Sequence, residues 1–379
     1  MFDLEEKLKT YAKIDLGALE RNYLAIKERI QKETPDCELM CVVKADAYGH
    51  GTERCVKRLT RLGAVCFGVS CIEEAREVKR YAAENSKILI LGYTPVENAD
   101  ELAREGFIQT VYSLEYGTAL SECAMRNGKA VRIHLKLDTG MNRLGFYAED
   151  AEACAREIRE VMALPCLLTE GIFTHFACAD SDESDVTERQ HASFMRVVDM
   201  LGDAAKELCV HCCNSAAALR YPQFRHSMVR AGIILYGLSP DRGYKLPVRL
   251  EPVMTFMTTV MHIHTLRKGE SISYGGRFTA DRDMRVATLG VGYADGFLRA
   301  FSQGGEVLIN GKPAPVVGRV CMDQCMVDIG DNEVKIGDRA VIFDSEGENI
   351  ERLAAFADTI CYELICLVGK RVKRISDDE

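Results

Sequence analysis

Residues 39–51 read LMCVVKADAYGHG, an apolar run that stops at Lys44 and leads into a segment with two glycines. The run is short and β-rich, which is typical of a buried strand. An open, doubly wound sheet usually carries the pattern GxGxxG directly after its first strand, and this segment lacks it. The segments that follow along the chain must therefore show which kind of sheet this strand belongs to.

The same pattern, a short apolar run followed by a helical stretch, is repeated as far as residue 234. Eight short apolar runs are present, and all but the last are followed by an amphipathic helical stretch: 39–43, 65–69, 88–91, 108–112, 131–137, 172–176, 208–213 and 228–234. Strands that alternate with helices form βα units and a parallel sheet. Eight such units predict an α/β fold in which a (β/α)8 TIM-like barrel occupies residues 9–240.

A different sequence pattern begins after residue 240. Helical periodicity is absent until Glu351, and short alternating stretches at 255–263, 284–289 and 316–320 replace it. Turn signals such as Asn310-Gly311 separate them. We expect a C-terminal, mostly-β domain over 241–375. An extra strand at 11–14 lies outside the eight and is expected to join that domain.

Composition and charge exclude several classes of protein. The net charge is −9 and no basic stripe is present, so no nucleic-acid partner is expected. No uninterrupted apolar run reaches 18 residues, which argues against a membrane span. The N-terminus lacks a basic-then-apolar signal pattern. These features predict a cytoplasmic protein.

The chain contains 16 cysteines. One CxxC pair, Cys209 and Cys212, falls inside an apparent strand, and no second CxxC completes a four-ligand set. Cys321 and Cys325 are four positions apart, a looser spacing. Many of the cysteines lie in apolar stretches, so we expect free, buried thiols and no metal site.

Lys44 is the first candidate for chemistry because it closes a buried strand. The carboxyl ends of barrel strands face the active site. An ammonium group held there is costly, so burial lowers the lysine pKa, and a neutral amine can form a Schiff base with an aldehyde. A lysine that only extends its amine to the rim of the barrel would look the same in the sequence.

The segment around Lys44 resembles the cofactor-lysine signature of alanine racemases. Further similarities follow in the expected order along nearly the whole chain: VVKADAYGHG (42–51), DTGMNRLG (138–145), THF (174–176), NS (214–215), RAGI (230–233), SYG (273–275), GRVCMDQ (318–324) and YE (362–363). The resemblance implies the same barrel and β domain that the alternation predicts. It also implies pyridoxal 5′-phosphate as cofactor and alanine as substrate.

The resemblance implies two catalytic bases. Lys44 would bind the cofactor and serve one face of the substrate, and Tyr274 would serve the other. Racemisation removes a proton from one face and delivers one to the opposite face, so two bases with suitable pKa values are needed. Arg230 would face the pyridine nitrogen of the cofactor. Because a guanidinium stays protonated, it favours an unprotonated ring nitrogen and restrains side reactions such as transamination.

The remaining site residues follow from the same resemblance. The cofactor phosphate would be bound by hydroxyl and backbone N–H groups of Tyr48, Ser215, Gly232, Ile233 and Tyr362. Ser215 could equally cap the helix that follows it. Arg143 would lie near the cofactor's phenolic oxygen and the substrate carboxylate, and Met322 would offer a backbone N–H to that carboxylate. His175 would lie in the hydrogen-bond network between Tyr274 and Arg230. Lys136 matches a lysine that some members carbamylate to steady the arginine, and an ion pair is the alternative.

The resemblance further implies a homodimer in which the β domain of one chain caps the barrel of the other. Each active site would then combine Lys44 with the partner subunit's Tyr274, and the product would supply D-alanine for peptidoglycan. One alternative is a serine or broad-specificity racemase of the same family, because a pocket rejects one extra hydroxyl only modestly. A decarboxylase or a non-enzymatic cofactor-binding protein fits less well, given Arg230 and the long C-terminal half.

Overall fold

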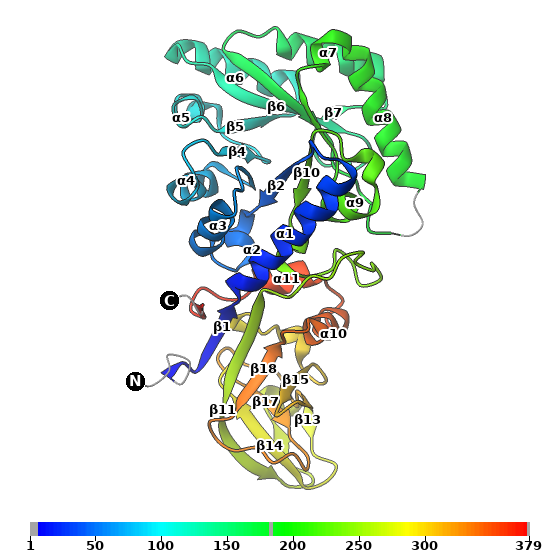
Figure 1. Ribbon diagram of the computed structural model, residues 1–379. Helices are drawn as coiled ribbons and strands as arrows, with labels where there is room; N and C mark the ends of the chain where they lie inside the picture. The colour runs from blue at the N-terminus through cyan, green and yellow to red at the C-terminus, as the bar shows by residue number, and fades with distance from the viewer. Residues whose placement is uncertain (1–6, 182–184, 377–379) are drawn as a thin grey trace.

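The computed structural model describes residues 7–181 and 185–376. Eight parallel strands form the barrel in the upper part of Figure 1. They are β2 (Glu38–Val42), β3 (Cys66–Val69), β4 (Lys87–Ile90), β5 (Ile108–Val111), β6 (Val131–Asp138), β8 (Leu167–Phe173), β9 (Cys209–His211) and β10 (Met228–Ala231). Each overlaps or adjoins a predicted run, so the predicted fold class is confirmed for this half of the chain.

The strands pair in the order β10-β2-β3-β4-β5-β6-β8-β9, with the short β7 (Phe146–Tyr147) beside β6. β9 and β10 are bridged by hydrogen bonds rather than by a ladder: Ser227 N donates to Val210 O (3.0 Å), and Arg230 N donates to Cys213 O (3.1 Å). The barrel is thus nearly closed. Helices follow the strands: α3 (Thr52–Arg61), α4 (Ile72–Tyr81), α5 (Ala99–Glu105), α6 (Leu114–Asn127), α7 (Ala151–Met162), α8 (Asp185–Leu201) and α9 (Ser215–Arg220).

The helix missing after the last strand is supplied by the N-terminal segment. Helix α1 (Leu16–Glu33), which the sequence analysis did not predict, packs on α3, on α9 and on the 3-10 turn η5 (Ile233–Tyr236) that follows β10. The carboxylate of Asp15 caps it by accepting from Ala18 N at 2.8 Å. Its buried residues include Tyr23 and Ile26, three apart on one face.

The second part of the chain is a β domain, as predicted. Its main sheet runs β16-β15-β18-β11-β1-β19. Beside this path, β14 pairs with β11, and β17 pairs with β14. The strands are β1 (Thr10–Ile14), β11 (Met254–Leu266), β14 (Met284–Leu289), β15 (Glu306–Ile309), β16 (Lys312–Pro315), β17 (Cys325–Asp328), β18 (Arg339–Phe343) and β19 (Lys373–Ile375), with a small hairpin of β12 (Ser271–Ile272) and β13 (Phe278–Thr279). The N-terminal strand β1 joins this sheet, as expected.

One predicted strand is absent from this domain. Of the stretch 316–320, only Val316 forms a bridge, to Val327. Gly318 has φ +72, and a Cβ there would lie 2.8 Å from the Cβ of Ser273. The close approach to Ser273 requires glycine and turns the chain away from the sheet. Asn310 and Gly311 form the predicted hairpin turn, with φ of 53 and 74.

Two helices of the C-terminal part, α10 (Glu348–Phe356) and α11 (Cys361–Cys366), complete the fold. α11 packs against α2 (Lys44–Tyr48), the short segment that follows the first barrel strand. At Gly49 a Cβ would lie 2.2 Å from the carbonyl oxygen of Ile365, so only glycine allows this contact. The same chain therefore brings part of its C-terminal domain to the mouth of its own barrel.

The 16 cysteines are all free, as expected. In the described residues, every helix is too short or too polar to cross a bilayer.

Asn22 joins helix α1 to both ends of the segment that connects the barrel to the β domain. Its Nδ2 donates to Leu235 O (3.1 Å) and Glu251 O (2.7 Å), and its Oδ1 accepts from Glu251 N (2.8 Å). Asn22→Ala would leave these buried groups unpaired, so we expect the free energy of unfolding to fall by about 3 kcal/mol. Urea denaturation followed by circular dichroism measures the loss. Asn98→Ala, which removes one exposed hydrogen bond to Pro95 O, is the control, and an equal effect of both would contradict the assignment.

Candidate active site

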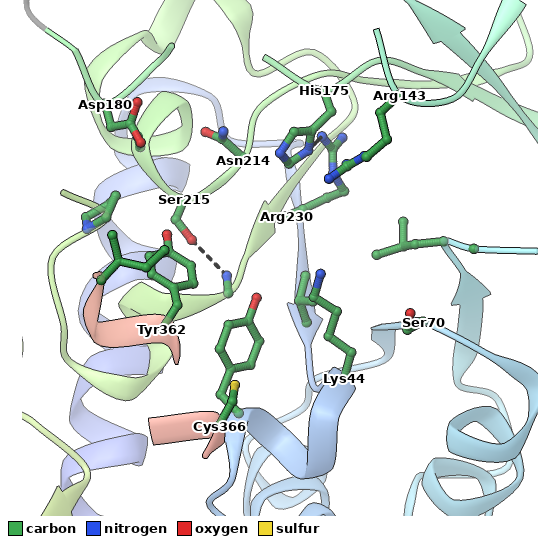
Figure 2. A pocket seen from close by; sticks show the side chains of 18 of the residues that line it. Lys44, Ser70, Arg143, His175, Asp180, Asn214, Ser215, Arg230, Tyr362 and Cys366 are labelled. Carbon is green, nitrogen blue, oxygen red and sulfur yellow. Dashed lines mark hydrogen bonds between the residues drawn. The ribbon is translucent and has the colours of Figure 1, made fainter. Parts of the chain in front are cut away.

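A cavity of about 770 Å³ opens at the carboxyl ends of the barrel strands. Figure 2 shows side chains from well-separated parts of the chain meeting there. Eight of the predicted site residues line it: Lys44, Tyr48, Arg143, His175, Ser215, Arg230, Gly232 and Tyr362. Ile233 lies next to Gly232 and is fully buried. The barrel topology brings together all of these residues except Tyr362, which reaches the cavity from α11.

Lys44 follows β2 directly, and its side chain points into the cavity (Figure 2). Burial, with a smaller contribution from the positive charge of Arg143, lowers its pKa. A larger fraction of the amine is therefore neutral at a given pH, which is the form that reacts with a carbonyl group.

The residues after Lys44 adopt an unusual backbone. Ala45, Asp46, Ala47 and Tyr48 all have φ between 52 and 55, in the left-handed region. Such a conformation costs about 1–2 kcal/mol per residue for an L-amino acid. It is held by Asp46, whose carboxylate accepts from Thr52 N at 2.7 Å, and by Glu74, which accepts from Ala45 N at 2.7 Å. The turn delivers both Lys44 and Tyr48 to one cavity.

A small polar cradle lies opposite Lys44. Gly232 N donates to Ser215 Oγ at 2.9 Å, the dashed line in Figure 2. A Cβ at position 232 would lie 2.5 Å from the hydroxyl of Tyr48. The rings of Tyr48 and Tyr362 are 6.1 Å apart. Hydroxyl and N–H donors therefore surround a space that only a glycine leaves open, which suits a phosphate group.

Ser215 is also the first residue of α9, but the helix is capped by another residue. The side chain of Asn214 accepts from Ala217 N at 3.0 Å. The Ser215 hydroxyl is therefore free of the capping role that the sequence left open, and it bonds to Gly232 instead.

Arg230 is buried on β10 at the inner wall of the cavity. Its Nη2 donates to Thr174 O (2.8 Å) and Cys212 O (3.0 Å) and lies 3.3 Å from His175 Nδ1. Its Nη1 lies 2.9 Å from His211 Nδ1. Within the described ranges no carboxylate lies within ion-pair distance. Burial lowers its pKa to about 10, so the guanidinium remains protonated near neutral pH.

His211 is a positioning residue that the sequence analysis missed. Because Arg230 has only donors, His211 Nδ1 must accept. His211 Nε2 then carries the proton and donates to His134 Nδ1, 2.9 Å away. Burial lowers the pKa of both imidazoles, that of His134 to about 3, so both rings are neutral. The available signal was a histidine inside each of two predicted barrel strands, where apolar residues are expected.

Lys136 and Arg143 lie on and after β6. The Lys136 amine donates to the carbonyl of Leu137 and sits 5.6 Å from the ring centre of Phe173. Burial lowers its pKa to about 7. In residues 7–181 and 185–376 it forms no ion pair, so that alternative lacks support and carbamylation stays a prediction. The loop of Arg143 is fixed by Asp138, whose carboxylate accepts from Arg143 N at 2.9 Å.

Tyr274 and Met322 are not part of this cavity. They lie together in the β domain, around a separate hollow of about 590 Å³ that Ser273, Cys321 and Asp323 also line. Tyr274 is 70% exposed and Met322 is 53% exposed. A single chain therefore does not bring Tyr274 to Lys44 or to His175.

A barrel whose carboxyl-end cavity combines a buried lysine amine, a buried arginine and a cradle of hydroxyl and N–H donors has the features of an enzyme active site. Two family models match: "Alanine racemase, N-terminal domain" over residues 14–240 and "Alanine racemase, C-terminal domain" over residues 253–376. The chain belongs to the alanine racemase family, and it is an isomerase of that family.

Known relatives agree along the whole chain. An alanine racemase of Desulforamulus reducens is 40% identical over 371 residues, which is 96% of this chain and 98% of the relative. The structure of alanine racemase from Clostridium difficile 630 is 37% identical with a TM-score of 0.89, and covers 98% of this chain and 97% of its own. Alanine racemase from Streptomyces coelicolor A3(2) is 31% identical with a TM-score of 0.90, and both chains are covered fully, 100% each. The predicted barrel and β domain are thereby confirmed.

Proposed function

We propose that this protein interconverts L-alanine and D-alanine with pyridoxal 5′-phosphate bound at Lys44. The observation that carries the proposal is the arrangement of the Lys44 amine, the Arg230 guanidinium and the Gly232 cradle around one cavity. Hydroxyl groups of Tyr48, Ser215 and Tyr362 and the backbone N–H groups of Gly232 and Ile233 would hold the phosphate. The bound cofactor supplies an electron sink that makes the α-proton of the amino acid acidic.

Side chains of the protein, rather than the cofactor, transfer the protons in this proposal. The Lys44 amine, whose pKa burial lowers, exchanges a proton with the substrate on one face. The hydroxyl of Tyr274 exchanges a proton on the opposite face. Arg143 and the backbone N–H of Met322 bind the substrate carboxylate and hold the α-carbon between the two bases.

Tyr274 and Met322 come from the partner subunit in this proposal. This proposal is supported by the exposure of both residues in one chain and by their absence from the Lys44 cavity. A twofold dimer in which each β domain covers the partner's barrel mouth would complete two sites at once.

The substrate test follows from the size of the pocket. Tyr362 lies at the cradle, its ring centre 6.1 Å from that of Tyr48, and the resemblance implies that an aromatic residue here belongs to an alanine-sized pocket. With a panel of L-amino acids and chiral chromatography of the products, we expect alanine to give the highest kcat/KM and serine to be weaker. A pocket that is not built against one extra hydroxyl discriminates by about 100-fold or less. Equal or faster turnover of serine, lysine or arginine would favour the broader-specificity alternative.

The product would supply D-alanine for peptidoglycan in the cytoplasm. Expression of the gene in a D-alanine auxotroph should restore growth without added D-alanine. If the purified enzyme racemises alanine but its gene does not restore growth of the auxotroph, the result would contradict this role.

Arg230 determines which reaction follows proton removal. Arg230→Glu would place a carboxylate against the ring nitrogen and keep that nitrogen protonated. We expect racemisation to fall by about 100-fold, as when one electrostatic contact in an active site is lost, and pyruvate formation by transamination to rise. Arg61→Glu, at an exposed arginine at the end of α3, is the control. Unchanged racemisation in Arg230→Glu would show that Arg230 does not contact the cofactor.

A further inference from the structure

A cluster of two histidines and a cysteine lies outside the active-site cavity, between helix α8 and the end of β9. His191 Nε2 and His226 Nε2 are 2.8 Å apart. The thiol of Cys212 completes the group, and the three ligand atoms all lie within 4.8 Å of one another. None of these residues has a role in the proposed reaction, although Cys212 contributes its carbonyl oxygen to Arg230.

The three side chains are held in place by their surroundings. The ring of His191 stacks on Phe224 with ring centres 3.9 Å apart. The thiol of Cys212 donates to the carbonyl oxygen of Phe224 at 3.0 Å, a proton that zinc binding would release. His226 has φ 45, a left-handed conformation that its neighbour Arg225, fully buried and hydrogen-bonded to Ala218 O at 2.9 Å, helps to maintain. The ligand atoms therefore converge without a large rearrangement.

We propose that His191, His226 and Cys212 bind a zinc ion, with water in the fourth position. Two imidazoles and a thiolate are the donors that zinc prefers over magnesium or calcium, and the cluster contains no carboxylate. A tetrahedral site with Zn–N bonds of about 2.0 Å needs the two nitrogens about 3.3 Å apart. The rings would have to separate by about half an ångström. The sulfur, which lies within 4.8 Å of the nitrogens, would have to come to about 3.5 Å from each of them. Both histidines are partly exposed, which leaves a path for the ion and the water.

The position of the site links it to the active-site arginine. The carbonyl oxygen of Cys212 accepts from Arg230 Nη2 at 3.0 Å, and Arg230 N donates to the carbonyl of the next residue, Cys213, at 3.1 Å. A metal bound to the Cys212 thiolate would therefore shift the backbone of Cys212, whose carbonyl oxygen positions Arg230. This consequence, a lower turnover in the zinc-loaded enzyme, rests on the proposed function, whereas zinc binding itself does not.

The test titrates metal-free holoenzyme with zinc against a chromophoric chelator and repeats the titration with cobalt(II). We expect one zinc per chain, and visible d–d bands of tetrahedral cobalt at longer wavelength than the cofactor absorbs. Cys212→Ser, His191→Gln and His226→Gln should each weaken zinc binding by more than about tenfold, the smallest loss seen even for changes around a metal ligand. The cofactor spectrum and circular dichroism of each variant verify that it folds.

Two matched controls are available in the chain. His262→Gln alters a histidine pair on β11, with rings 5.4 Å from those of His264, that lacks a cysteine. Cys55→Ser alters a buried thiol of α3. Both variants should bind zinc as the wild type does. Fewer than one zinc bound per chain in excess zinc would contradict the proposed site. So would zinc binding that is unchanged in both Cys212→Ser and His226→Gln.

Turnover is measured in the same titration. It should fall in step with zinc occupancy in the wild type and stay constant in His226→Gln. Full occupancy without loss of turnover would overturn the link to Arg230. A metal-free enzyme that binds zinc but does not racemise alanine would instead contradict the proposed function, so the two failures are distinguishable.

Discussion

Lys44→Ala is expected to lower the rate of alanine racemisation by more than about 10⁴-fold, the upper range for loss of one acid–base group. In the proposed mechanism, the change removes the amine that holds the cofactor and the base that serves one face of the substrate. Lys44→Arg keeps the positive charge but cannot form a Schiff base, so it should be about as inactive. Racemase assays of the two variants at saturating cofactor therefore test the amine itself rather than its charge.

A second buried amine makes this test specific. Lys136 lines the same cavity, and burial lowers its pKa to about 7. Its amine, however, donates a hydrogen bond to the Leu137 carbonyl and lies near the Phe173 ring. The Lys44 side chain instead points into the cavity. Borohydride reduction followed by peptide mapping should place the cofactor on Lys44. A label on the Lys136 peptide, or activity of Lys44→Ala within about tenfold of wild type, would remove Lys44 from its proposed role.

The fold could be read from the sequence because its signal is local and repeated. Each barrel strand is a short apolar run, and the carboxyl ends of parallel strands must meet at one face. Lys44 at the end of β2 and Arg230 on β10 therefore had to approach each other once eight units were counted. The structure brings both to the 770 Å³ cavity.

Helix α1 was readable but was missed. Asp15 is a good N-cap residue, and the buried positions Leu19, Tyr23, Ile26 and Ile30 follow helical spacing. Its place in the barrel was not readable, because it precedes the first barrel strand in the chain and yet packs beside the last. Chain order gives no information about such a closure.

Other features depend on three-dimensional proximity alone. The left-handed turn after Lys44 contains ordinary residues whose propensity opposes it, so only the packing of Asp46 and Glu74 explains it. The pairing of His134 with His211 joins positions 77 residues apart. The sequence also predicted no metal site, because no second CxxC pair completes a four-ligand set. The approach of His191 and His226 to Cys212 is visible only in the folded chain.

The position of Tyr274 is the feature from which we infer that a second subunit completes the active site. The family motif predicts a base at Tyr274, yet one chain leaves it 70% exposed and outside the Lys44 cavity. If both bases act on one substrate, the partner must supply one of them. Two inactive variants with lesions in different domains would then complement each other, because a mixed dimer has one doubly damaged site and one intact site.

Lys44→Ala and Tyr274→Phe should each be nearly inactive, with the tyrosine change costing about 10²–10⁴-fold. Refolding equal amounts together should restore up to about a quarter of wild-type activity, because random pairing makes half of the dimers mixed and each has one intact site of two. A mixture of Lys44→Ala and Lys44→Arg, which damage the same barrel, should not recover. Differently tagged chains allow mixed dimers to be isolated, and an inactive mixed dimer of Lys44→Ala and Tyr274→Phe would show that both bases belong to one chain.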